Sequence, residues 1–509
     1  MDRLSIALKL GILFTAFVIW LRLIIFVDKD AKKRRLKYQS FWTTLTFFFN
    51  IVGFLLYLLF RPKKGRIKCD YCGFDLTKEL KRTNIFICPN CKRLIRPEIV
   101  GEVFFSKIEK FNPDRVRIIG LKDEDALRRS SVEDSRNILS VVKFYISQAI
   151  SNRATDIHFD PEKEKIRVRE RIDGVLYDAI PLPRDLGIKL VAAIKSLASL
   201  DIAQRKEPQG GRFDVDVNNR RYDLRISTSY SIFGEKIAVR ILDRSGDLLE
   251  LKRLGLSEDD LRQLEDSISK PHGMILVCGP TGCGKSTTLY SILKRLSSKK
   301  NIMTIEDPVE YELRGVNQQQ INPKAGIDFA TGLRSILRQD PDVIMVGEIR
   351  DAETAQIAIQ AADTGHLVLS TMHSIDTANA ITRLREFGIS PHYLSTSLLL
   401  IVAQRLIRKL CPHCKKKVKN EKGAENEMTN IYEPKGCPKC NYTGFRGRTG
   451  IFEILNIDRE VRDLIFRDVS PSVLRDNYVR LGIETLKEKG IKKVLNGQTI
   501  LEEVNSVVP

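Results

Sequence analysis

The 509-residue sequence has no internal repeat and no long low-complexity tract, so solenoid and repetitive fibrous architectures are excluded. It also lacks the small-residue cleavage site of a secretory signal peptide, and its first apolar run is followed by a second long one. Hydrophobic residues make up 43% and charged residues 29% of the chain, which excludes a disordered tail or a collagen-like rod. What remains is a folded protein long enough for three or four domains.

The chain carries an excess of positive charge, with 84 Lys and Arg against 64 Asp and Glu, a net charge of +20. Residues 1–68 hold 14 Lys and Arg against 3 Asp and Glu, a net of +11, which leaves +9 for the other 441 residues. More than half of the excess therefore lies beside the two apolar runs. This distribution favours contact with a membrane surface over contact with nucleic acid.

Two apolar segments, residues 4–27 and 41–60, predict an N-terminal membrane anchor within residues 1–68. The second segment has 20 residues and no charge, enough to cross a hydrocarbon core of about 30 Å. Lys9 and Arg22 interrupt the first segment, but their long side chains can reach the headgroups. A pair of buried core helices is the alternative. The topology stays open, because basic stretches on both sides of the second segment favour the cytoplasmic face unless one segment is re-entrant.

Eight of the ten cysteines form four Cys-x-x-Cys pairs, a pattern that predicts two metal sites. Zinc takes four thiolates in a tetrahedron, and one Cys-x-x-Cys turn supplies two of them. Disulfides are the alternative, but they form outside the reducing cytosol. We expect a structural metal, with His413 as a bystander. The two predicted zinc sites are Cys69, Cys72, Cys88 and Cys91, in a zinc ribbon at residues 69–91, and Cys411, Cys414, Cys437 and Cys440.

A phosphate-binding loop is predicted between an apolar strand at residues 274–278 and a helical run at residues 287–296. Its pattern is G-x-x-x-x-G-K-S. In such a loop the backbone N–H groups surround a phosphate and the helix N-terminus adds its dipole. Lys285 is expected to reach the β- and γ-phosphates, and Ser286 to hold Mg²⁺. The predicted nucleotide-binding residues of the loop are Gly279, Pro280, Thr281, Gly282, Cys283, Gly284, Lys285, Ser286 and Thr287.

Three further segments are typical of a nucleotide fold. An apolar strand at residues 343–346 ends shortly before Glu348, where a carboxylate can order Mg²⁺ or the attacking water. The segment TIEDPVEY, residues 304–311, is densely acidic, and taken alone it favours a solvated loop. A third apolar strand has His366 at one end and His373 at the other. A lone histidine is usually structural, but either of these can sense the γ-phosphate in a nucleotide fold.

In chain order, the segments GPTGCGKSTTLY, TIEDPVEY, LRQDPDVIMVGEIRD and TGHLVLSTMH resemble the ATPase family of type II secretion systems and type IV pili. The resemblance covers about residues 133–509. It implies an α/β fold, with a RecA-like P-loop ATPase domain at residues 256–509. A small α+β, PAS-like regulatory domain at residues 133–245 would precede it, with a linker near residues 245–255.

The resemblance also assigns residue roles in the predicted ATPase domain. It implies that Glu310 and Glu348 are the catalytic carboxylates and that they act together with Lys285. It implies that His373 lies near the γ-phosphate, with His366 as a second candidate.

The resemblance extends on both sides of the nucleotide motifs. ATDIHFDP, RERIDG, GGR and RIST resemble the regulatory domain, which implies that Arg212, Arg225 and Arg240 close over the nucleotide. Without the resemblance these arginines are ordinary surface charge, although a planar guanidinium fork suits phosphate. QRLIRKLC, the second cysteine quartet and GFRGRTGIFE match the zinc-bearing insertion of assembly-type members, here residues 408–441. Retraction-type members typically lack this insertion.

The first 130 residues depart from the family pattern, because they leave no room for its usual large docking domain. They contain the predicted anchor, the zinc ribbon and a polar connector at residues 92–132. Beyond them we expect an amphipathic helix around residues 141–151 and a mobile, lysine-rich loop at residues 415–432. Tyr230 replaces the usual proline and Cys283 a common serine, but no catalytic group is missing.

These patterns predict a membrane-tethered ATPase that powers the assembly of pilin-like subunits in a type IV pilus or type II secretion machine. Glu348 would position the attacking water while Lys285 and the regulatory arginines stabilise the transferring phosphoryl group. The resemblance implies a homohexameric ring that acts on an inner-membrane platform protein. The expected cofactors are ATP, Mg²⁺ and Zn²⁺, and the expected location is the bacterial inner membrane, with the ATPase domain in the cytoplasm.

Two other classes of function fit part of the sequence. A DNA-translocating, membrane-associated ATPase would suit the net charge and the zinc sites. However, residues 271–400 contain 12 Lys and Arg against 13 Asp and Glu, a net of −1 without a basic stripe, so direct nucleic-acid binding is not expected. A catalytically silent membrane scaffold is disfavoured because every expected catalytic group is present, namely Lys285, Ser286, Glu310, Glu348 and His373.

Overall fold

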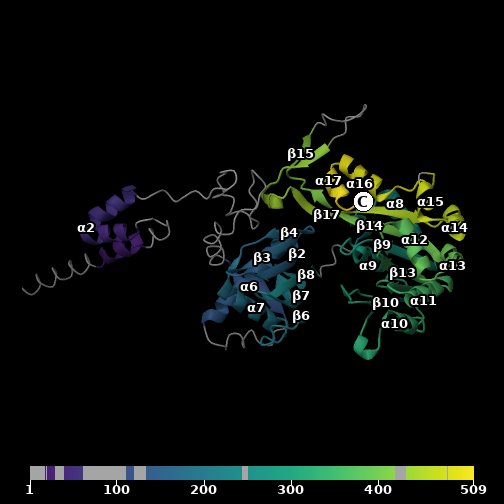
Figure 1. Ribbon diagram of the computed structural model, residues 1–509, viewed down its shortest axis with the longest axis horizontal. Coiled ribbons are helices and arrows are strands. Elements are labelled where there is room, and N and C mark those ends of the chain that lie inside the picture. The colour runs from purple at the N-terminus through teal and green to yellow at the C-terminus, as the bar shows by residue number, and fades with distance from the viewer. Residues whose placement is uncertain are drawn as a thin grey trace, which may run out of the picture. The chain divides into compact units, whose positions relative to one another are not determined.

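The chain folds into two compact units, Met1–Lys81 and Arg82–Pro509, which we describe separately (Figure 1). The predicted zinc ribbon at residues 69–91 and part of the predicted linker lie outside the residues that the structure describes. The computed structural model describes residues 18, 20–28, 39–60, 111–119, 133–243, 250–418, 431–478 and 480–508.

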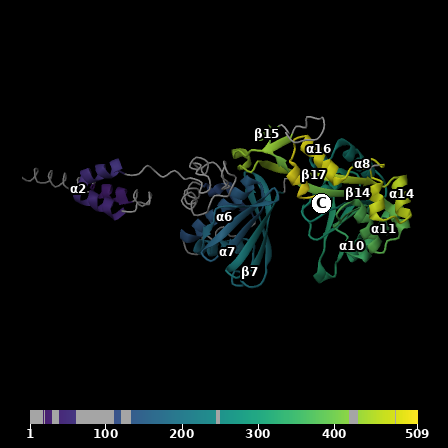
Figure 2. The same ribbon diagram turned by 45° about the horizontal axis from the view of Figure 1, so that its top comes forward.

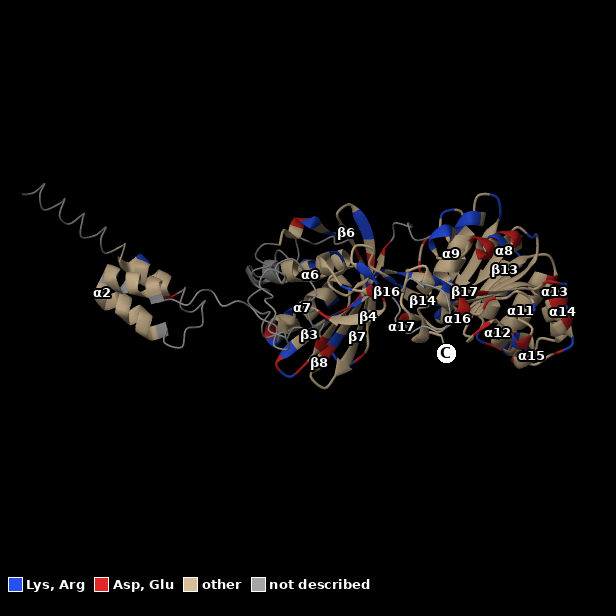
Figure 3. Cartoon of the chain, turned by 90° about the horizontal axis from the view of Figure 1, so that it is seen from above, with Lys and Arg blue, Asp and Glu red and all other residues tan. Residues whose placement is uncertain are grey.

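The first unit contains helix α2 (Gln39–Phe60), which has 22 residues and no charged side chain (Figure 3). Residues 20–28 are helical as well. Val27 and Tyr57 are completely buried and form a small apolar cluster that joins the two segments. The described residues of this unit therefore form two helical segments with a minimal core between them.

Many apolar side chains of α2 point outwards. Phe48 is 73% exposed and Leu59 is 77% exposed, and apolar surface of this kind marks an interaction site. In the described ranges, no helix is both long enough and apolar enough to cross a membrane. The predicted membrane-spanning segment at residues 41–60 is therefore not confirmed, and most of the first predicted segment lies outside the described residues.

In the second unit, the segment before the nucleotide motifs forms an antiparallel eight-stranded sheet. Its strand order is β1-β6-β7-β8-β2-β3-β4, with β5 paired to β3. Helices α6 (Glu133–Asn152) and α7 (Arg184–Leu197) cover one face (Figure 2), so buried and less buried residues alternate along the strands. The strands are β1 (Val116–Ile119), β2 (Ala154–Pro161), β3 (Lys165–Ile172), β4 (Val175–Asp178), β5 (Leu182–Pro183), β6 (Gly210–Val217), β7 (Arg220–Ser231) and β8 (Gly234–Asp243).

Strand β1 is not predicted from the sequence, in which residues 92–132 are expected to form a connector. Val116–Ile119 pair antiparallel with β6 and add an edge to the sheet. Val116 and Ile118 are buried, whereas Arg117 is exposed and forms an ion pair with Asp216 at 2.8 Å. The alternation is that of a strand, but four residues are too few to stand out in a polar segment.

The nucleotide motifs belong to a second, seven-stranded sheet with the order β11-β10-β12-β13-β9-β14-β17. All its neighbours are parallel except β14 and β17. Strands β9, β12 and β13 are buried along their whole length, as expected when helices cover both faces. The predicted α/β class is confirmed. The strands are β9 (Gly273–Cys278), β10 (Ile302–Glu306), β11 (Asn317–Gln320), β12 (Val343–Val346), β13 (Leu367–Met372), β14 (Leu398–Leu410) and β17 (Phe445–Asn456).

Two apolar cores lie on the two faces of this sheet. One contains residues of α8 and α9, such as Leu264 and Leu289, and the other contains residues of α10 to α12, such as Leu333, Ala358 and Leu384. The helices are α8 (Glu258–Ile268), α9 (Lys285–Leu296), α10 (Phe329–Ile336), α11 (Ala352–Asp363), α12 (Thr377–Glu386), α13 (Pro391–Ser397), α14 (Arg459–Phe466), α15 (Pro471–Asp476), α16 (Leu486–Leu495) and α17 (Leu501–Asn505).

The predicted mobile loop at residues 415–432 is ordered at both ends. Strands β15 (Lys415–Val418) and β16 (Ile431–Pro434) pair antiparallel, and the Lys415 ammonium lies 4.6 Å from the centre of the Tyr432 ring. Residues 419–430 lie outside the described ranges.

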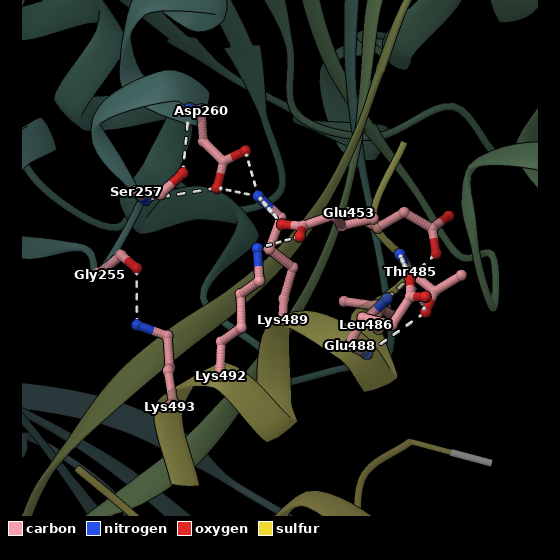
Figure 4. A network of polar contacts seen from close by, with 11 residues as sticks. Gly255, Ser257, Asp260, Glu453, Thr485, Leu486, Glu488, Lys489, Lys492 and Lys493 are labelled. Carbon is pink, nitrogen blue, oxygen red and sulfur yellow. Dashed lines mark hydrogen bonds and ion pairs between the residues drawn. The ribbon is translucent and has the colours of Figure 1, made fainter. Parts of the chain in front are cut away.

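Helix α16 is attached to the start of α8 by a buried ion pair (Figure 4). Lys489 Nζ lies 2.8 Å from Asp260 Oδ1. Asp260 also forms a capping box with Ser257, which ends the loop before α8. Lys493 donates a hydrogen bond to the Gly255 carbonyl at 2.8 Å. These contacts fix the segment through which the chain enters the parallel sheet.

Candidate active site

The nucleotide motifs converge at one edge of the parallel sheet. Strands β9, β10, β12 and β13 end at this edge, and each is followed by one of the motifs predicted from the sequence. The carboxyl ends of parallel strands share an edge, so segments far apart in the chain become neighbours. The groups that follow these strands are the phosphate loop, the acidic box with Glu310, Glu348 and His373.

The phosphate loop has the backbone geometry that its glycines predict. Gly279 has a φ of +150°, and a Cβ there would lie 2.6 Å from the Gln404 carbonyl oxygen. Gly284, with a φ of +92°, is the N-cap of α9. Ser286 lies in the first turn of that helix and is exposed. The sequence thus forms a tight loop that leads into a helix N-terminus, the arrangement that binds phosphate.

Lys285 is held close to the loop. Its ammonium donates hydrogen bonds to the carbonyls of Gly279 at 2.8 Å and Pro280 at 3.1 Å. Burial lowers the pKa of Lys285, and the nearby Glu348 carboxylate opposes this effect. Burial also raises the pKa of the Cys283 thiol, which favours the protonated, unreactive form.

Glu348 lies between a guanidinium and an imidazole. Arg350 Nη2 forms an ion pair with Glu348 Oε1, and His373 Nε2 lies 3.7 Å from Glu348 Oε2. The Arg350 guanidinium also lies 3.8 Å from Asp307, and its hydrogen bond with Glu348 raises the pKa of Arg350. The structure thus brings Glu348 and His373 together as predicted. It adds Arg350, whose only signal in the sequence is its position two residues after Glu348.

His366 does not belong to this edge. It precedes the first residue of β13, and its Nδ1 lies 3.0 Å from the Ala361 carbonyl oxygen. The strand separates it from His373 by about 20 Å. The prediction that His366 lies near the γ-phosphate is therefore wrong, because two histidines at the ends of one strand face opposite edges of the sheet.

The acidic box is only partly solvated. The Glu306 side chain, 3% exposed, ends strand β10 and accepts hydrogen bonds from the Thr304 hydroxyl at 2.6 Å and the Gln318 amide at 3.1 Å. The Tyr290 hydroxyl donates a third. Burial raises the pKa of Glu306, and these hydrogen bonds oppose the shift. The interpretation of this segment as a solvated loop is therefore wrong for Glu306, whereas Glu310 is partly exposed.

The three predicted arginines stand side by side on the antiparallel sheet. Arg212 pairs with Arg225 across β6 and β7, and Arg225 pairs with Arg240 across β7 and β8. Like charges directly opposite each other destabilise a sheet, so this row favours an anionic partner. Arg225 Nη1 lies 3.1 Å from Glu310 Oε2, and Arg240 Nε lies 3.2 Å from Asp156 Oδ1. Arg225 is thus in contact with the acidic box.

Gln404 is a site residue to which the sequence analysis assigned no role. Its amide donates a hydrogen bond to the Cys283 carbonyl and accepts one from the Thr288 hydroxyl, both at 2.7 Å. The side chain is 2% exposed. It therefore joins β14 to the phosphate loop, a contact between segments far apart in the chain that no local pattern reveals.

The second cysteine quartet comes together as predicted. Ligand atoms of Cys411, Cys414, Cys437 and Cys440 all lie within 4.8 Å of one another, and His413 is not part of the group. Three of the sulfur–sulfur distances are 3.8–3.9 Å, and all four thiols are free, which excludes disulfides among them. The first quartet, with Cys69, lies outside the described residues.

A sequence profile for the family described as "Type II/IV secretion system protein" matches residues 131–506, which is well over half of the chain. The chain belongs to this family.

Individual relatives agree with this assignment. Type II secretion system protein E of Dickeya dadantii is 48% identical over 382 residues, which cover 73% of this chain and 76% of the relative. Type II secretion system ATPase E of Vibrio cholerae is 43% identical over 394 residues, 76% of this chain and 78% of the relative. The solved structure of the ATPase DotB from Legionella pneumophila shares the fold, with a TM-score of 0.54 and 22% identity over 71% of this chain and 93% of DotB.

Membership of this family confirms the general function predicted from the sequence, an ATPase motor for secretion or pilus assembly. It also confirms that the resemblance in the nucleotide motifs reflects common descent over most of the chain. The matched region spans the parallel sheet and all of the antiparallel sheet except its edge strand β1.

Proposed function

We propose that this secretion ATPase hydrolyses ATP, with Mg²⁺, to assemble pilin-like subunits in a type II secretion or type IV pilus machine. The observation that supports this most is the convergence of the phosphate loop, Glu310, Glu348 and His373 at one edge of the parallel sheet. This edge is where α/β proteins bind ligands, and the groups suit phosphoryl transfer to water.

Each residue has a proposed role in the reaction. Lys285 and the N–H groups of the loop would bind the β- and γ-phosphates, while the exposed Ser286 would hold the metal. Glu348 orients the attacking water and accepts its proton, and His373 lies beside that carboxylate. Mg²⁺, when bound, would offset negative charge on the phosphate oxygens.

The antiparallel sheet would complete the site with positive charge. We assign Arg212, Arg225 and Arg240 to the γ-phosphate, since three neighbouring guanidiniums match its charge and geometry. In this assignment Arg225 exchanges its contact with Glu310 for one with the nucleotide. Residues 133–245 would then act as the regulatory domain and residues 256–509 as the ATPase domain.

The four-cysteine cluster is proposed to hold a structural zinc ion. A tetrahedral zinc with bonds of about 2.3 Å places its four sulfurs about 3.8 Å apart. The sulfurs of Cys411 and Cys437, for example, are 3.9 Å apart, which fits this geometry. The insertion supports an assembly or secretion motor over a retraction motor. A second zinc site at Cys69, Cys72, Cys88 and Cys91 remains a prediction.

The assembly and the location are also proposals. We infer a homohexameric ring that transmits the motion of its subunits to an inner-membrane platform protein, with the ATPase portion in the cytoplasm. Attachment to the membrane through residues 1–68 is supported by the exposed apolar side chains of α2, such as Phe48 and Leu59. The net charge of +11 on the same residues favours anionic lipid.

The assignment of the site is tested by turnover. Glu348→Gln and Lys285→Ala should each lower ATP hydrolysis by about a hundredfold or more, because each removes a group that acts in the transition state. Glu353→Gln is a matched control, since Glu353 is exposed and pairs with Arg334 on the surface. Hydrolysis at the wild-type rate in both site variants would show that the site is wrongly assigned.

A further inference from the structure

A fully buried tyrosine links the phosphate-loop helix to the acidic box. Tyr290 lies on α9, is 1% exposed and packs edge-on against the Tyr311 ring at 5.6 Å. Its hydroxyl donates a hydrogen bond to Glu306 Oε2. The same oxygen accepts the backbone N–H groups of Glu310 at 3.1 Å and Tyr311 at 3.5 Å. A phenol has one donor and two lone pairs, and all three are used here.

The direction of these hydrogen bonds is fixed. A backbone N–H can only donate, so the Tyr290 oxygen must accept from Glu310 and Tyr311. Its single hydrogen is left for Glu306, and this carboxylate must accept it. The two hydrogen bonds from the Thr304 hydroxyl and the Gln318 amide reach the other carboxylate oxygen, Oε1. Glu306 is thus an acceptor at both oxygens.

Gln318 holds the same loop from the other side. Its amide nitrogen donates to Glu306 and to the Tyr311 carbonyl at 2.9 Å, and its carbonyl accepts the Leu313 N–H at 2.7 Å. Of the three side chains that bind Glu306, Tyr290 and Gln318 therefore also bind the backbone of the loop that carries Glu310. A buried carboxylate that has only neutral hydrogen-bond donors destabilises the folded state unless every one of these hydrogen bonds is formed. The network therefore favours a single arrangement of the loop.

The network ends next to the predicted metal ligand. Ser286 and Tyr290 are four residues apart on α9, so they lie on the same face of the helix, one turn from each other. The position of Glu310 is therefore set relative to the helix that carries Lys285 and Ser286.

We propose that Tyr290 and Glu306 are positioning residues that hold the loop of Glu310 in register with the phosphate loop. Tyr290 acts through the backbone of Glu310 and does not touch the nucleotide, and Glu306 fixes the orientation of the Tyr290 hydroxyl. This inference rests on the proposed role of Glu310 in ATP hydrolysis. It predicts that loss of one buried hydroxyl slows turnover without weakening the binding of ATP.

The test is Tyr290→Phe in the full chain, which keeps the ring and removes the hydroxyl. We expect kcat for ATP hydrolysis to fall about tenfold to hundredfold, with KM for ATP within about threefold of wild type, because a misplaced catalytic group affects the transition state most. Tyr478→Phe is the matched control. Tyr478 is also buried and its hydroxyl bonds to Thr377 at 2.6 Å, and neither of these two residues has a proposed catalytic role.

Glu306→Gln gives a second measurement of the same network. An amide has one acceptor oxygen, so the variant must lose either the hydrogen bond from Tyr290 or those from Thr304 and Gln318. We expect kcat to fall as in Tyr290→Phe. Equal kcat values for Tyr290→Phe and Tyr478→Phe, or a raised KM with an unchanged kcat, would overturn the proposal.

A double variant separates positioning from general stability. If Tyr290 acts through Glu310, then Tyr290→Phe combined with Glu310→Gln should turn over as slowly as Glu310→Gln alone. A further, additive loss in the double variant would contradict this. The proposed function is judged independently: if Glu348→Gln abolishes hydrolysis while Tyr290→Phe leaves kcat intact, only the positioning role fails. If Glu348→Gln retains wild-type activity, the site itself is wrong.

Discussion

The two sheets of the second unit carry their charged groups in different places. In the parallel sheet, β9, β12 and β13 are buried throughout, so the proposed catalytic groups occur only beyond the ends of strands. In the antiparallel sheet, no helix of the described residues covers the second face, and arginines such as Arg225 stand in the middle of strands.

This difference separates two ways of building a phosphate site. At the edge of the parallel sheet, the site depends on the backbone of loops, which glycines and buried side chains hold in place. On the antiparallel sheet, the site depends on strand register, since a shift of one residue in β7 would turn Arg225 toward the helix-covered face. Backbone changes should therefore harm the first site most, and side-chain changes the second.

A single added methyl group in the phosphate loop is expected to have the largest effect, which is a loss of ATP affinity. In Gly279→Ala, the new Cβ would meet the Gln404 carbonyl oxygen at 2.6 Å at a φ of +150°. The loop must move, and we expect a loss of about 3 kcal/mol, or about a hundredfold, in ATP affinity. Titration calorimetry with ATP would measure it.

Gly326→Ala is the control for this change. Gly326 also has a positive φ, +72°, but its Cβ would meet nothing within 4 Å. It should reduce stability by only about 1 kcal/mol and leave ATP affinity as it is. Comparable affinities for the Gly279→Ala variant and the wild type would show that the loop backbone does not determine binding.

The helix-covered face of the antiparallel sheet contains a buried acid whose titration can be measured. Glu170 on β3 is 2% exposed, and its carboxylate accepts a hydrogen bond from the Asn152 amide at 2.7 Å. Burial raises the pKa of Glu170 from 4.5 to about 7, and the hydrogen bond opposes the shift. Between these two values the folded state binds the proton and the unfolded state does not, so the stability contribution is present at low pH and is lost as the pH rises to about 7.

We therefore expect the free energy of unfolding to fall by up to about 3 kcal/mol between pH 5 and pH 8 from this group. Glu170→Gln resembles the protonated acid and should remove this dependence, as urea unfolding at the two pH values would show. Glu164→Gln, at an exposed position in the turn before β3, should leave the dependence unchanged. If the Glu170→Gln variant kept the pH dependence of the wild type, another group would be responsible for the change in stability.

The same contrast explains which features the sequence predicts. Parallel strands buried on both faces read as continuous apolar runs, so residues 343–346 coincide with β12, and the phosphate loop follows from local spacing. Each Cys-x-x-Cys pair is likewise a local pattern, so the sequence predicts the four-cysteine cluster that the structure shows. Antiparallel strands with one polar face give a weaker pattern, and β1 was missed.

Features that depend on strand order, strand direction or register could not be predicted from the sequence. His366 and His373 look alike along the chain, but only the direction of β13 decides which of them reaches the nucleotide edge. The Gln404 contact with the phosphate loop joins residues 121 positions apart. The row of three arginines requires the register of β6, β7 and β8, which no pattern in the sequence states.

The smallest expected effect on ATP hydrolysis comes from a substitution in the row of arginines on the antiparallel sheet. Arg240 is 61% exposed at its side chain, stands between Arg225 and Asp156 in the sheet and pairs with Asp156. If the row binds the γ-phosphate, Arg240→Ala should lower kcat/KM for ATP by about tenfold, since one of three charge-assisted contacts is lost. Arg117→Ala removes a similarly exposed arginine that pairs with Asp216 at the edge of the same sheet, and it should have no effect on hydrolysis. Arg240→Lys keeps the charge without the planar fork and should recover only part of the loss. Steady-state kinetics of the three variants would decide between a phosphate-binding row and ordinary surface charge, for which Arg240→Ala and Arg117→Ala would behave alike.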